Sequence, residues 1–253
     1  MADVTYMPSV LILGGTSDLG VRVAREFLRR GWLPLLSGRH EEALRQIARD
    51  LEVRSGVSVP VLRYDAERPE DHASLPDRCR DILGRLPDGV ISCVGLLPDP
   101  EQVRHDSTLA RTCLTTNLTG IITALDPFVN QFEARRAGFL GVVTSVAGDR
   151  GRKSNYHYAA AKAGLNVYLE GLRHRLHGSG VTVTTIKPGY LRTKMVAGME
   201  LPAPLVTDPE RVAAPAVNAV LAGRRVVYVP GWWRWIMLAV RVIPELLFVR
   251  TNI

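Results

Sequence analysis

Short apolar runs alternate with amphipathic helical stretches along most of the chain, and this alternation limits the possible folds more than any other feature. The runs lack the polar alternation of half-exposed strands, so they are typical of strands buried on both faces. We predict strands at 10–15, 32–38, 59–65, 89–95, 139–145, 181–189 and 225–231. Helical patterns between them include 21–30, 41–51 and 163–176. This order predicts an α/β fold, a doubly wound parallel sheet of about seven strands with helices on both faces.

The composition fits one globular domain. The chain has 253 residues, of which 46% are hydrophobic and 23% charged, so it can bury a substantial core. Its three cysteines are odd in number and lack CxxC spacing, so neither a disulfide framework nor a metal site is expected. Free thiols suit a reducing cytoplasm. No basic region followed by a long apolar region precedes the first predicted strand, so no signal peptide is expected.

The net charge of +7 at pH 7 is compatible with nucleic acid, anionic lipid or phosphorylated ligands as partners. The arginines are scattered over predicted helix faces, and no zinc-finger, basic-zipper or RNA-binding signature accompanies them. We therefore expect no nucleic-acid partner.

The first predicted strand leads directly into the glycine-rich loop GGTSDLG at 14–20, which opens a helix. Glycines let a backbone approach a pyrophosphate, and the unpaired N–H groups of a helix N-terminus bind it. The loop predicts a dinucleotide site. The expected contacts are Gly14, Thr16, Ser17, Leu19 and Gly20. The carboxylate of Asp18 would repel a pyrophosphate, so we expect Asp18 to point away and support the helix start.

The second loop reads SGRH at 37–40 and follows the second predicted strand. An acidic residue at this place would bind a ribose 2′-hydroxyl, whereas here Arg39 supplies a cation that suits a 2′-phosphate. This predicts NADP(H) as cofactor in preference to NAD(H). The alternative is an ordinary surface arginine.

The stretch NYHYAAAK at 155–162 contains one of only four lysines among 32 basic residues. On a helix, Tyr158 and Lys162 lie at i and i+4, about 40° apart, whereas Tyr156 lies about 120° from Lys162. A nearby ammonium would favour phenolate and lower the pKa of Tyr158, which suits a proton donor. The alternative is an exposed helical pair without a catalytic role.

Together these motifs resemble the short-chain dehydrogenases/reductases over nearly the whole chain. The resemblance implies a Rossmann-type domain at 1–231 and an NAD(P)-dependent oxidoreductase. It also implies a catalytic set: Asn117, Ser145, Tyr158 and Lys162. Ser145 would hydrogen-bond the substrate carbonyl, Tyr158 would donate the proton, Lys162 would lower the phenol pKa and hold the ribose, and Asn117 would anchor a water.

Further cofactor contacts follow from the same resemblance. They are Asp65 near the adenine, Gly95 after the fourth strand, Tyr158 and Lys162 at the ribose, and the later turn with Pro188, Gly189 and Thr193. The chain departs from the family pattern at Asp18, where a glycine is usual, and at 92–95, where SCVG replaces Asn-Asn-Ala-Gly. The family also implies a homodimer or homotetramer built through two long central helices.

The tail at 232–253 continues beyond the usual end of the family. Its apolar, aromatic segment 232–250 is interrupted by Arg234, Arg241, Pro244 and Glu245, so it does not make a comfortable membrane span. We expect an interfacial helix that attaches a cytoplasmic protein to the inner membrane face as a peripheral protein. The alternatives are a subunit interface or a cap on the substrate pocket.

Within the family, the pattern is similar to that of the reductases acting on decaprenylphosphoryl-2-keto-ribose. The similarity lies in GGTSDLG, VGLLPD, AGDRGRKSNYHYAAAKAGL, KPGYLRTKM and the tail through IPELLF. It implies NADPH-dependent reduction of the 2-keto group of a polyprenyl-phosphate-linked sugar. A generic ketoreductase acting on another small or lipid carbonyl is the main alternative. A non-catalytic NADPH-sensing regulator is the second.

Overall fold

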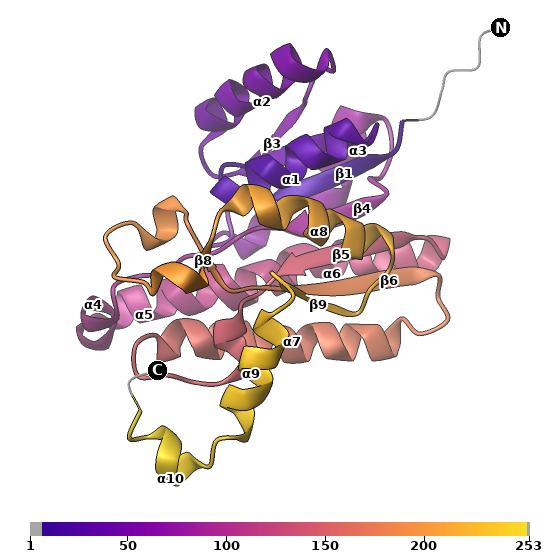
Figure 1. The fold of residues 1–253 in the computed structure, drawn as a ribbon. Coiled ribbons are helices and arrows are strands. Elements are labelled where there is room, and N and C mark those ends of the chain that lie inside the picture. Colours follow the sequence, from indigo (N-terminus) through magenta and orange to yellow (C-terminus); the bar gives the residue numbers. More distant parts are fainter. Residues whose placement is uncertain (1–6, 252–253) are drawn as a thin grey trace, which may run out of the picture.

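The computed structural model describes residues 7–251. Its centre is a seven-stranded sheet in the order β3-β2-β1-β4-β5-β6-β9, and every neighbouring pair is parallel (Figure 1). The strands are β1 (Ser9–Leu13), β2 (Leu33–Gly38), β3 (Val61–Arg63), β4 (Gly89–Ser92), β5 (Gly138–Val143), β6 (Val181–Pro188) and β9 (Val226–Val229). The predicted single-domain α/β fold and its seven strands are confirmed, although most strands end earlier than the apolar runs that predict them.

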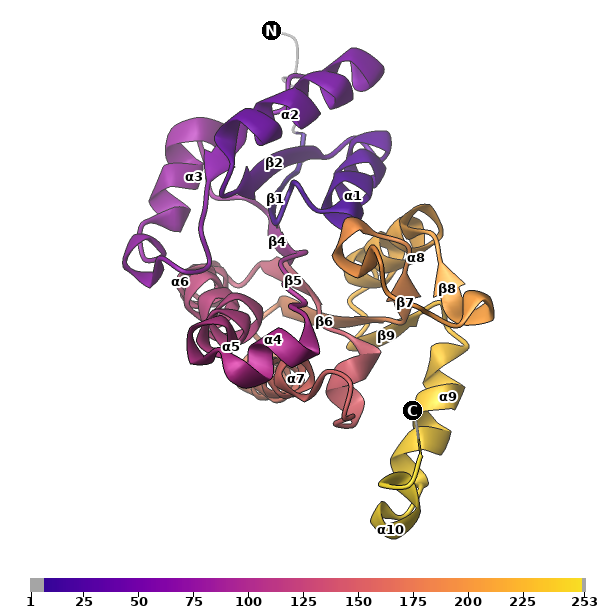
Figure 2. The same ribbon diagram turned by 90° about the vertical axis from the view of Figure 1, so that its left-hand side faces the viewer.

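Helices cover both faces of the sheet (Figure 2). They are α1 (Asp18–Arg29), α2 (Glu41–Ser55), α3 (Leu75–Leu83), α4 (Pro100–His105), α5 (Ser107–Leu114), α6 (Gly120–Arg135), α7 (Tyr156–Arg175), α8 (Pro209–Leu221), α9 (Trp233–Val242) and α10 (Glu245–Phe248). Apolar residues of α3, α6 and α7 build the core on one face. Those of α1, α2 and α8 build it on the other. Both faces of the sheet are therefore buried from solvent, as the uninterrupted apolar runs of the strands require.

The order of the strands creates a switch point between β1 and β4. From β1 the chain proceeds outward through β2 and β3, and then returns to place β4 on the other side of β1. The loops after β1 and β4 consequently diverge at the carboxyl edge of the sheet. In open α/β sheets this crevice is where ligands bind.

Two further strands were not apparent in the sequence. The pair β7 (Tyr190–Leu191) and β8 (Val206–Thr207) forms a separate parallel ladder beside the carboxyl edge. Each strand has two residues, which is too short to produce a periodic pattern. This ladder supports the segment between β6 and α8, including the short helical turn η4 (Lys194–Val196).

The tail packs one face of α9 against the domain. Trp233, Met237 and Val240 are buried at helical spacing and form a small core with Val146. In both views α9 and α10 extend at the end of the molecule opposite α2 (Figures 1 and 2). The other face carries exposed large apolar side chains, Trp232, Trp235, Leu238, Val242, Leu246, Leu247 and Val249. Among residues 7–251, no helix is both long and apolar enough to cross a membrane.

Arg150 fastens the tail to the loop after β5. Its Nη1 donates hydrogen bonds of 2.6 Å to the carbonyl oxygens of Val240 and Ile243, which end α9. Its guanidinium lies 3.8 Å from the ring centroid of Phe248 in α10. Charged hydrogen bonds at a helix C-terminus are favourable because the exposed carbonyls there lack backbone partners.

Candidate active site

A cavity of about 370 Å³ lies at the carboxyl ends of the strands, at the switch point. Residues from both ends of the sequence meet there. Most of the predicted site residues line it: Gly14, Thr16, Ser17, Leu19, Arg39, Asp65, Gly95, Ser145, Tyr158, Lys162, Pro188, Gly189 and Thr193. Gly20 and Asn117 are not among the lining residues.

The glycine loop has the backbone that close approach to a phosphate requires. Gly14 has a φ of +80°, and a Cβ there would lie 2.9 Å from the carbonyl carbon of Cys93. A Cβ on Gly20 would collide with the carbonyl oxygen of Gly14. Ser17 caps α1, since its Oγ accepts a hydrogen bond of 3.0 Å from the Gly20 N–H. The loop is thus a compact cradle at a helix N-terminus, which fits the pyrophosphate of a dinucleotide.

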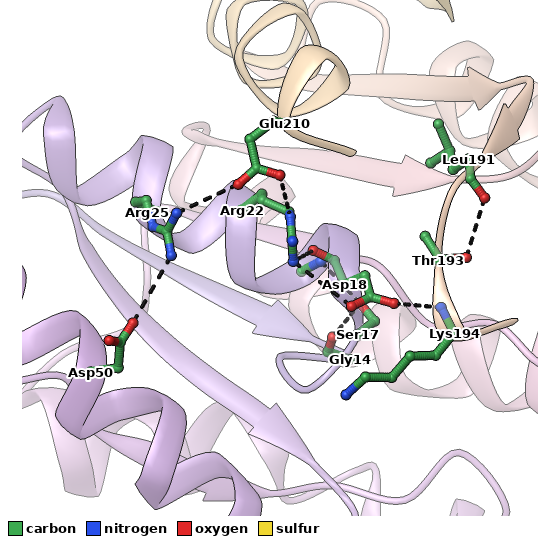
Figure 3. Close-up of polar contacts among 11 residues, drawn as sticks. Gly14, Ser17, Asp18, Arg22, Arg25, Asp50, Leu191, Thr193, Lys194 and Glu210 are labelled. Atoms are coloured by element: carbon green, nitrogen blue, oxygen red, sulfur yellow. Dashed lines mark hydrogen bonds and ion pairs between the residues drawn. The ribbon is translucent and has the colours of Figure 1, made fainter. Parts of the chain in front are cut away.

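Asp18 is one of the residues that line the cavity. Its Oδ2 accepts a hydrogen bond of 2.7 Å from the backbone N–H of Lys194 (Figure 3). Arg22 lies 3.8 Å from Oδ1, and the carboxylate sits in the first turn of α1, where the helix dipole favours negative charge. Asp18 therefore supports the start of this helix, and its orientation relative to a pyrophosphate stays a prediction.

Arg39 lies at the open edge of the cavity. Its Nη1 is 3.3 Å from Glu67 Oε1, which also accepts a 3.3 Å hydrogen bond from Thr116 Oγ1. Exposed ion pairs of this kind contribute little, so a phosphate could replace Glu67 as the partner of Arg39. Asp65 is nearby on the wall, where its Oδ1 accepts a hydrogen bond of 3.1 Å from the Glu67 N–H.

Tyr158 and Lys162 face the cavity from one side of α7, with Nζ 5.7 Å from the Tyr158 ring centroid. Tyr156 is exposed instead and stacks on His157 at a centroid distance of 4.4 Å. Ser145 lies opposite, at the end of β5, where its Oγ accepts a hydrogen bond of 3.0 Å from the Ala147 N–H. The structure therefore brings the three predicted groups together and leaves Tyr156 out.

Burial is the largest influence on the pKa values of Tyr158 and Lys162. Removal from water raises the pKa of Tyr158 to about 12, although a hydrogen bond with Ser145 acts in the opposite direction. Removal from water also lowers the pKa of Lys162 to about 8. The Lys162 ammonium donates instead to the carbonyls of Val94 and Val143, at 3.2 and 3.3 Å. The expectation that Lys162 pulls the phenol pKa toward neutrality is therefore wrong for this structure.

Asn117 sits within a π-helical turn, η2 (Thr115–Thr119), and is fully buried. Its Nδ2 donates to the carbonyls of Leu96, at 2.6 Å, and Cys113, at 2.9 Å, while its Oδ1 accepts from the Leu96 N–H at 3.0 Å. The side chain thus ties the loop after β4 to α5 and η2. A π-turn at such a place is a frequent feature of functional sites. Asn117 is not among the residues that line the cavity, and its water-binding role stays a prediction.

The turn after β6 brings the tail to the cavity. Pro188, Gly189 and Thr193 line the wall there. A Cβ on Gly189 would overlap the indole of Trp233, so the glycine leaves space for this tail residue. Trp233 also packs edge-on against Tyr190, with centroids 5.5 Å apart. The inner face of the tail therefore supports the cavity wall at Gly189 and Tyr190.

Several lining residues were not predicted from the sequence. They include Asp18, Arg152, Asn155, Tyr190, Lys194 and Met195. They come from loops and from the ends or short turns of elements, where no periodic pattern indicates which side chains turn inward. The cluster of three cations in DRGRK, just before the active helix, was the only sequence signal for Arg152. Within residues 7–251, no group of His, Cys, Asp and Glu is arranged to hold a metal ion.

Comparison with known proteins identifies the family. The sequence profile of short chain dehydrogenase matches residues 8–202. The chain belongs to this family. An uncharacterized oxidoreductase of Mycobacterium tuberculosis is 33% identical over 248 residues, which cover 98% of both chains. An uncharacterized oxidoreductase of Streptomyces coelicolor is 34% identical over 246 residues, covering 96% of this chain and 95% of the relative.

Solved short-chain dehydrogenases have the same fold. A short-chain dehydrogenase from Sphingobium yanoikuyae, in complex with NADPH, is 26% identical with a TM-score of 0.81, covering 94% of this chain and 97% of that one. Actinorhodin polyketide ketoreductase with NADPH has a TM-score of 0.77 at 21% identity, covering 89% and 96%. The protein is thus an oxidoreductase of a fold that binds NAD(P). These relatives do not point specifically to a decaprenylphosphoryl-2-keto-ribose reductase.

Proposed function

We propose that this short-chain dehydrogenase uses NADPH to reduce a ketone to a secondary alcohol. The observation that carries the proposal is that Ser145, Tyr158 and Lys162 line one cavity together with the glycine loop. The nicotinamide cofactor supplies the hydride when it is bound. Cofactor contacts are proposed for Gly14, Thr16, Ser17, Leu19, Gly20, Arg39, Asp65, Gly95, Tyr158, Lys162, Pro188, Gly189 and Thr193.

Tyr158, Ser145 and Lys162 have different roles in the proposed proton transfer. Because the pKa of Tyr158 is about 12, its Oη keeps a proton at neutral pH that it can donate as charge develops on the substrate oxygen. Ser145 Oγ accepts from the Ala147 N–H and is hydrogen-bonded to Tyr158. A bound substrate oxygen would replace this contact and accept hydrogen bonds from both hydroxyls. The pKa of Lys162 is about 8, which allows Nζ to hold or release a proton near neutral pH.

Asn117 enters the proposed mechanism as a positioning residue. Its two hydrogen bonds with Leu96 fix the loop that carries Gly95. A Cβ on Gly95 would lie 3.6 Å from Asn117 Oδ1 and 3.9 Å from Lys162 Nζ, so this loop passes directly over both side chains. Its fixed position keeps the space beside Lys162 open.

Replacement of the two tyrosines tests the proposal. Tyr158→Phe removes the proton donor and should lower kcat for ketone reduction at least about 100-fold, while NADPH binding persists. Tyr156→Phe is the matched control on the same helix and should reduce the rate only mildly. Turnover that survives in Tyr158→Phe would contradict the assigned role. Wild-type protein that binds NADPH but reduces no ketone would favour an NADPH-sensing regulator.

For the substrate, the proposal is a ketone on a polyprenyl-phosphate-linked sugar. Such a molecule has a polar reactive head, an anionic phosphate and an apolar chain. The tail supports this choice because it carries seven exposed large apolar side chains, from Trp232 to Val249, next to exposed Arg234 and Arg241. A domain at 1–231 with an interfacial tail at 232–253, peripheral on the inner membrane face, is the corresponding arrangement. A soluble ketone as preferred substrate would instead indicate a generic ketoreductase.

A homodimer or homotetramer is proposed for the assembly. Val167 on α7 is 69% exposed, and Leu114 at the end of α5 is also exposed, so these two helices present apolar side chains that a second subunit could cover. Sedimentation velocity should give the mass of a dimer or tetramer. Val167→Glu should shift the protein toward monomer.

A further inference from the structure

Arg152 is a buried arginine on the wall of the active-site cavity, and no carboxylate among residues 7–251 balances its charge. Arg152 is only 7% exposed to solvent. Its Nε has no hydrogen-bond partner, and Nη1 has only a long bond of 3.3 Å to Tyr190 Oη. Within residues 7–251, no carboxylate lies at ion-pair distance from this guanidinium.

Such an arrangement is unfavourable for folding alone. Buried charges are normally paired and fully hydrogen-bonded, because removal of an ion from water is costly. Lys187 follows that rule through a 2.5 Å ion pair with Asp149. The inward-facing cations Arg150 and Lys162 donate to backbone carbonyls. Arg152 has neither an ion pair nor a carbonyl acceptor among residues 7–251, and this requires an explanation.

The surroundings of Arg152 favour a ligand of negative charge. Tyr190 Oη accepts from the guanidinium, so its own hydrogen is available for a second acceptor. Asn155, at the start of α7, also lines the cavity, and its Oδ1 is buried without a partner. This oxygen is an acceptor, so it would take a hydroxyl of the ligand and not its anionic group. The Asn155 N–H donates to the Arg152 carbonyl at 3.2 Å, which holds this turn in place. The ring of Trp233 packs edge-on against the ring of Tyr190 and so fixes its position.

The same cavity contains Ser145 and Tyr158. An oxyanion bound at Arg152 would consequently belong to the molecule whose carbonyl those two residues contact. We infer that Arg152 and Tyr190 form a subsite for an anionic group, a carboxylate or a phosphate, on the carbonyl substrate. The claim that the bound anion is part of a ketone substrate rests on the proposed ketone reduction. The anion subsite itself rests on the buried and unbalanced guanidinium.

The subsite predicts a preference among ketones that differ only in charge. Acetoacetate, acetonylphosphonate and ethyl acetoacetate place a carboxylate, a phosphonate and a neutral ester one carbon from the same ketone. In wild-type protein with NADPH, kcat/KM should be higher for an anion than for the ester. A charged hydrogen-bonded contact of this kind corresponds to a factor on the order of 10 to 100. The ranking of the carboxylate and the phosphonate identifies the class of anion.

Replacement of Arg152 should remove that preference. In Arg152→Gln the ratio of kcat/KM between anion and ester should fall by the same factor of roughly 10 to 100, and Tyr190→Phe should lower it by a smaller factor. Lys153→Gln, which removes one positive charge at the neighbouring exposed position, is the matched control and should leave the ratio unchanged. An equal loss for the anion and the ester would overturn the inference and make Arg152 a structural residue.

Binding and stability measurements decide the matter even if no probe is turned over. Calorimetric titration of NADP-saturated protein with acetonylphosphonate should show binding to wild type and none to Arg152→Gln. Without the probe, Arg152→Met should keep or raise the Tm, because an unbalanced buried charge is replaced by an apolar chain. A marked fall in Tm, or equal binding by both proteins, would overturn the subsite. Binding without reduction would preserve the subsite and refute the proposed ketone reduction.

Discussion

The carboxylate of Asp18 accepts a hydrogen bond from the backbone N–H of Lys194 at 2.7 Å, and so joins the glycine loop to a segment 176 residues further along the chain (Figure 3). Asp18 begins α1, which leads on to Arg22, and Arg22 Nε donates to Glu210 of α8 at 2.6 Å. The segment that Asp18 holds includes Thr193 and Lys194 on the cavity wall. This bond thus joins two segments of the cavity wall that are far apart in the sequence.

We expect the bond to order the Lys194 segment and to support cofactor binding. In Asp18→Ala, amide hydrogen exchange in peptides covering 192–197 should become faster, because the Lys194 N–H loses its acceptor. The NADPH Kd should rise about tenfold, as expected for a lost hydrogen bond to a charged group. Asp18→Asn keeps an acceptor and should show a smaller effect. Tighter NADPH binding by Asp18→Asn would mean that repulsion of the pyrophosphate outweighs the bond.

Arg39 should determine the choice between NADPH and NADH. Arg39→Ala should raise the Kd for NADPH about tenfold, because a charge-assisted contact to the 2′-phosphate is lost, and should leave the Kd for NADH nearly unchanged. Fluorescence titration of both cofactors measures this difference. Glu67→Gln provides a test in the opposite direction, since it removes the carboxylate 3.3 Å from Arg39 and should increase the preference for NADPH. Equal losses for both cofactors in Arg39→Ala would make it a surface residue.

The sequence predicted the strands and the helical pair more fully than the contacts among loops. Uninterrupted apolar runs are sufficient to place buried strands, and the spacing of Tyr158 and Lys162 is sufficient to place them on one side of a helix. The direction of the pKa of Tyr158 could not be predicted, because it depends on burial by distant parts of the chain. Whether the side chain of Arg152 lies in the cavity also depends on the packing of the whole chain. Neither the hydrophobic periodicity nor the spacing of residues in the sequence predicts it.

Lys162 should make stability depend on alkaline pH. The pKa of this lysine is about 8 in the folded state and 10.5 for the free side chain, so between these values the unfolded chain binds a proton that the folded chain has released. The contribution of Lys162 to the free energy of unfolding should therefore rise from pH 8 to pH 10. Burial raises the pKa values of Cys79, Cys93 and Tyr158 to about 12, and these groups act in the opposite direction. The contribution of Lys162 is therefore measured as the difference between wild type and a Lys162 variant.

Urea unfolding at pH 8 and pH 10 measures this contribution. Because a tenfold change in proton affinity corresponds to about 1.4 kcal/mol, the stability of wild type relative to Lys162→Met should increase by about 2 kcal/mol across this range. Lys153→Met, at an exposed position before α7, is the control for removal of one lysine. A constant difference between wild type and Lys162→Met would show that Lys162 remains fully charged in the folded protein at pH 10.

The two faces of the tail should be separable by mutation. The inner face packs Trp233 over Gly189 and Tyr190, so complete removal of 232–253 would disturb the cavity as well as any membrane contact. The outer face can be changed alone, since Trp235 is 66% exposed and Leu246 is 79% exposed. Replacement of both outer residues by Gln should leave the Tm nearly unchanged. Trp233→Ala should lower it, because a buried aromatic side chain is removed.

Vesicle binding then decides what the outer face contacts. Large apolar side chains contribute roughly 1.5 to 3 kcal/mol each when they are buried, enough for reversible attachment to an interface. Wild-type protein should co-sediment with phosphatidylglycerol vesicles, and Trp235→Gln/Leu246→Gln should remain in the supernatant with an unchanged subunit mass. Because added salt screens the contacts of Arg234 and Arg241 with the lipid phosphates, it should weaken the attachment of the wild type. A wild-type protein that ignores these vesicles, or a double variant that changes the oligomeric mass instead, would assign the outer face to a subunit interface and remove the main support for a lipid-linked substrate.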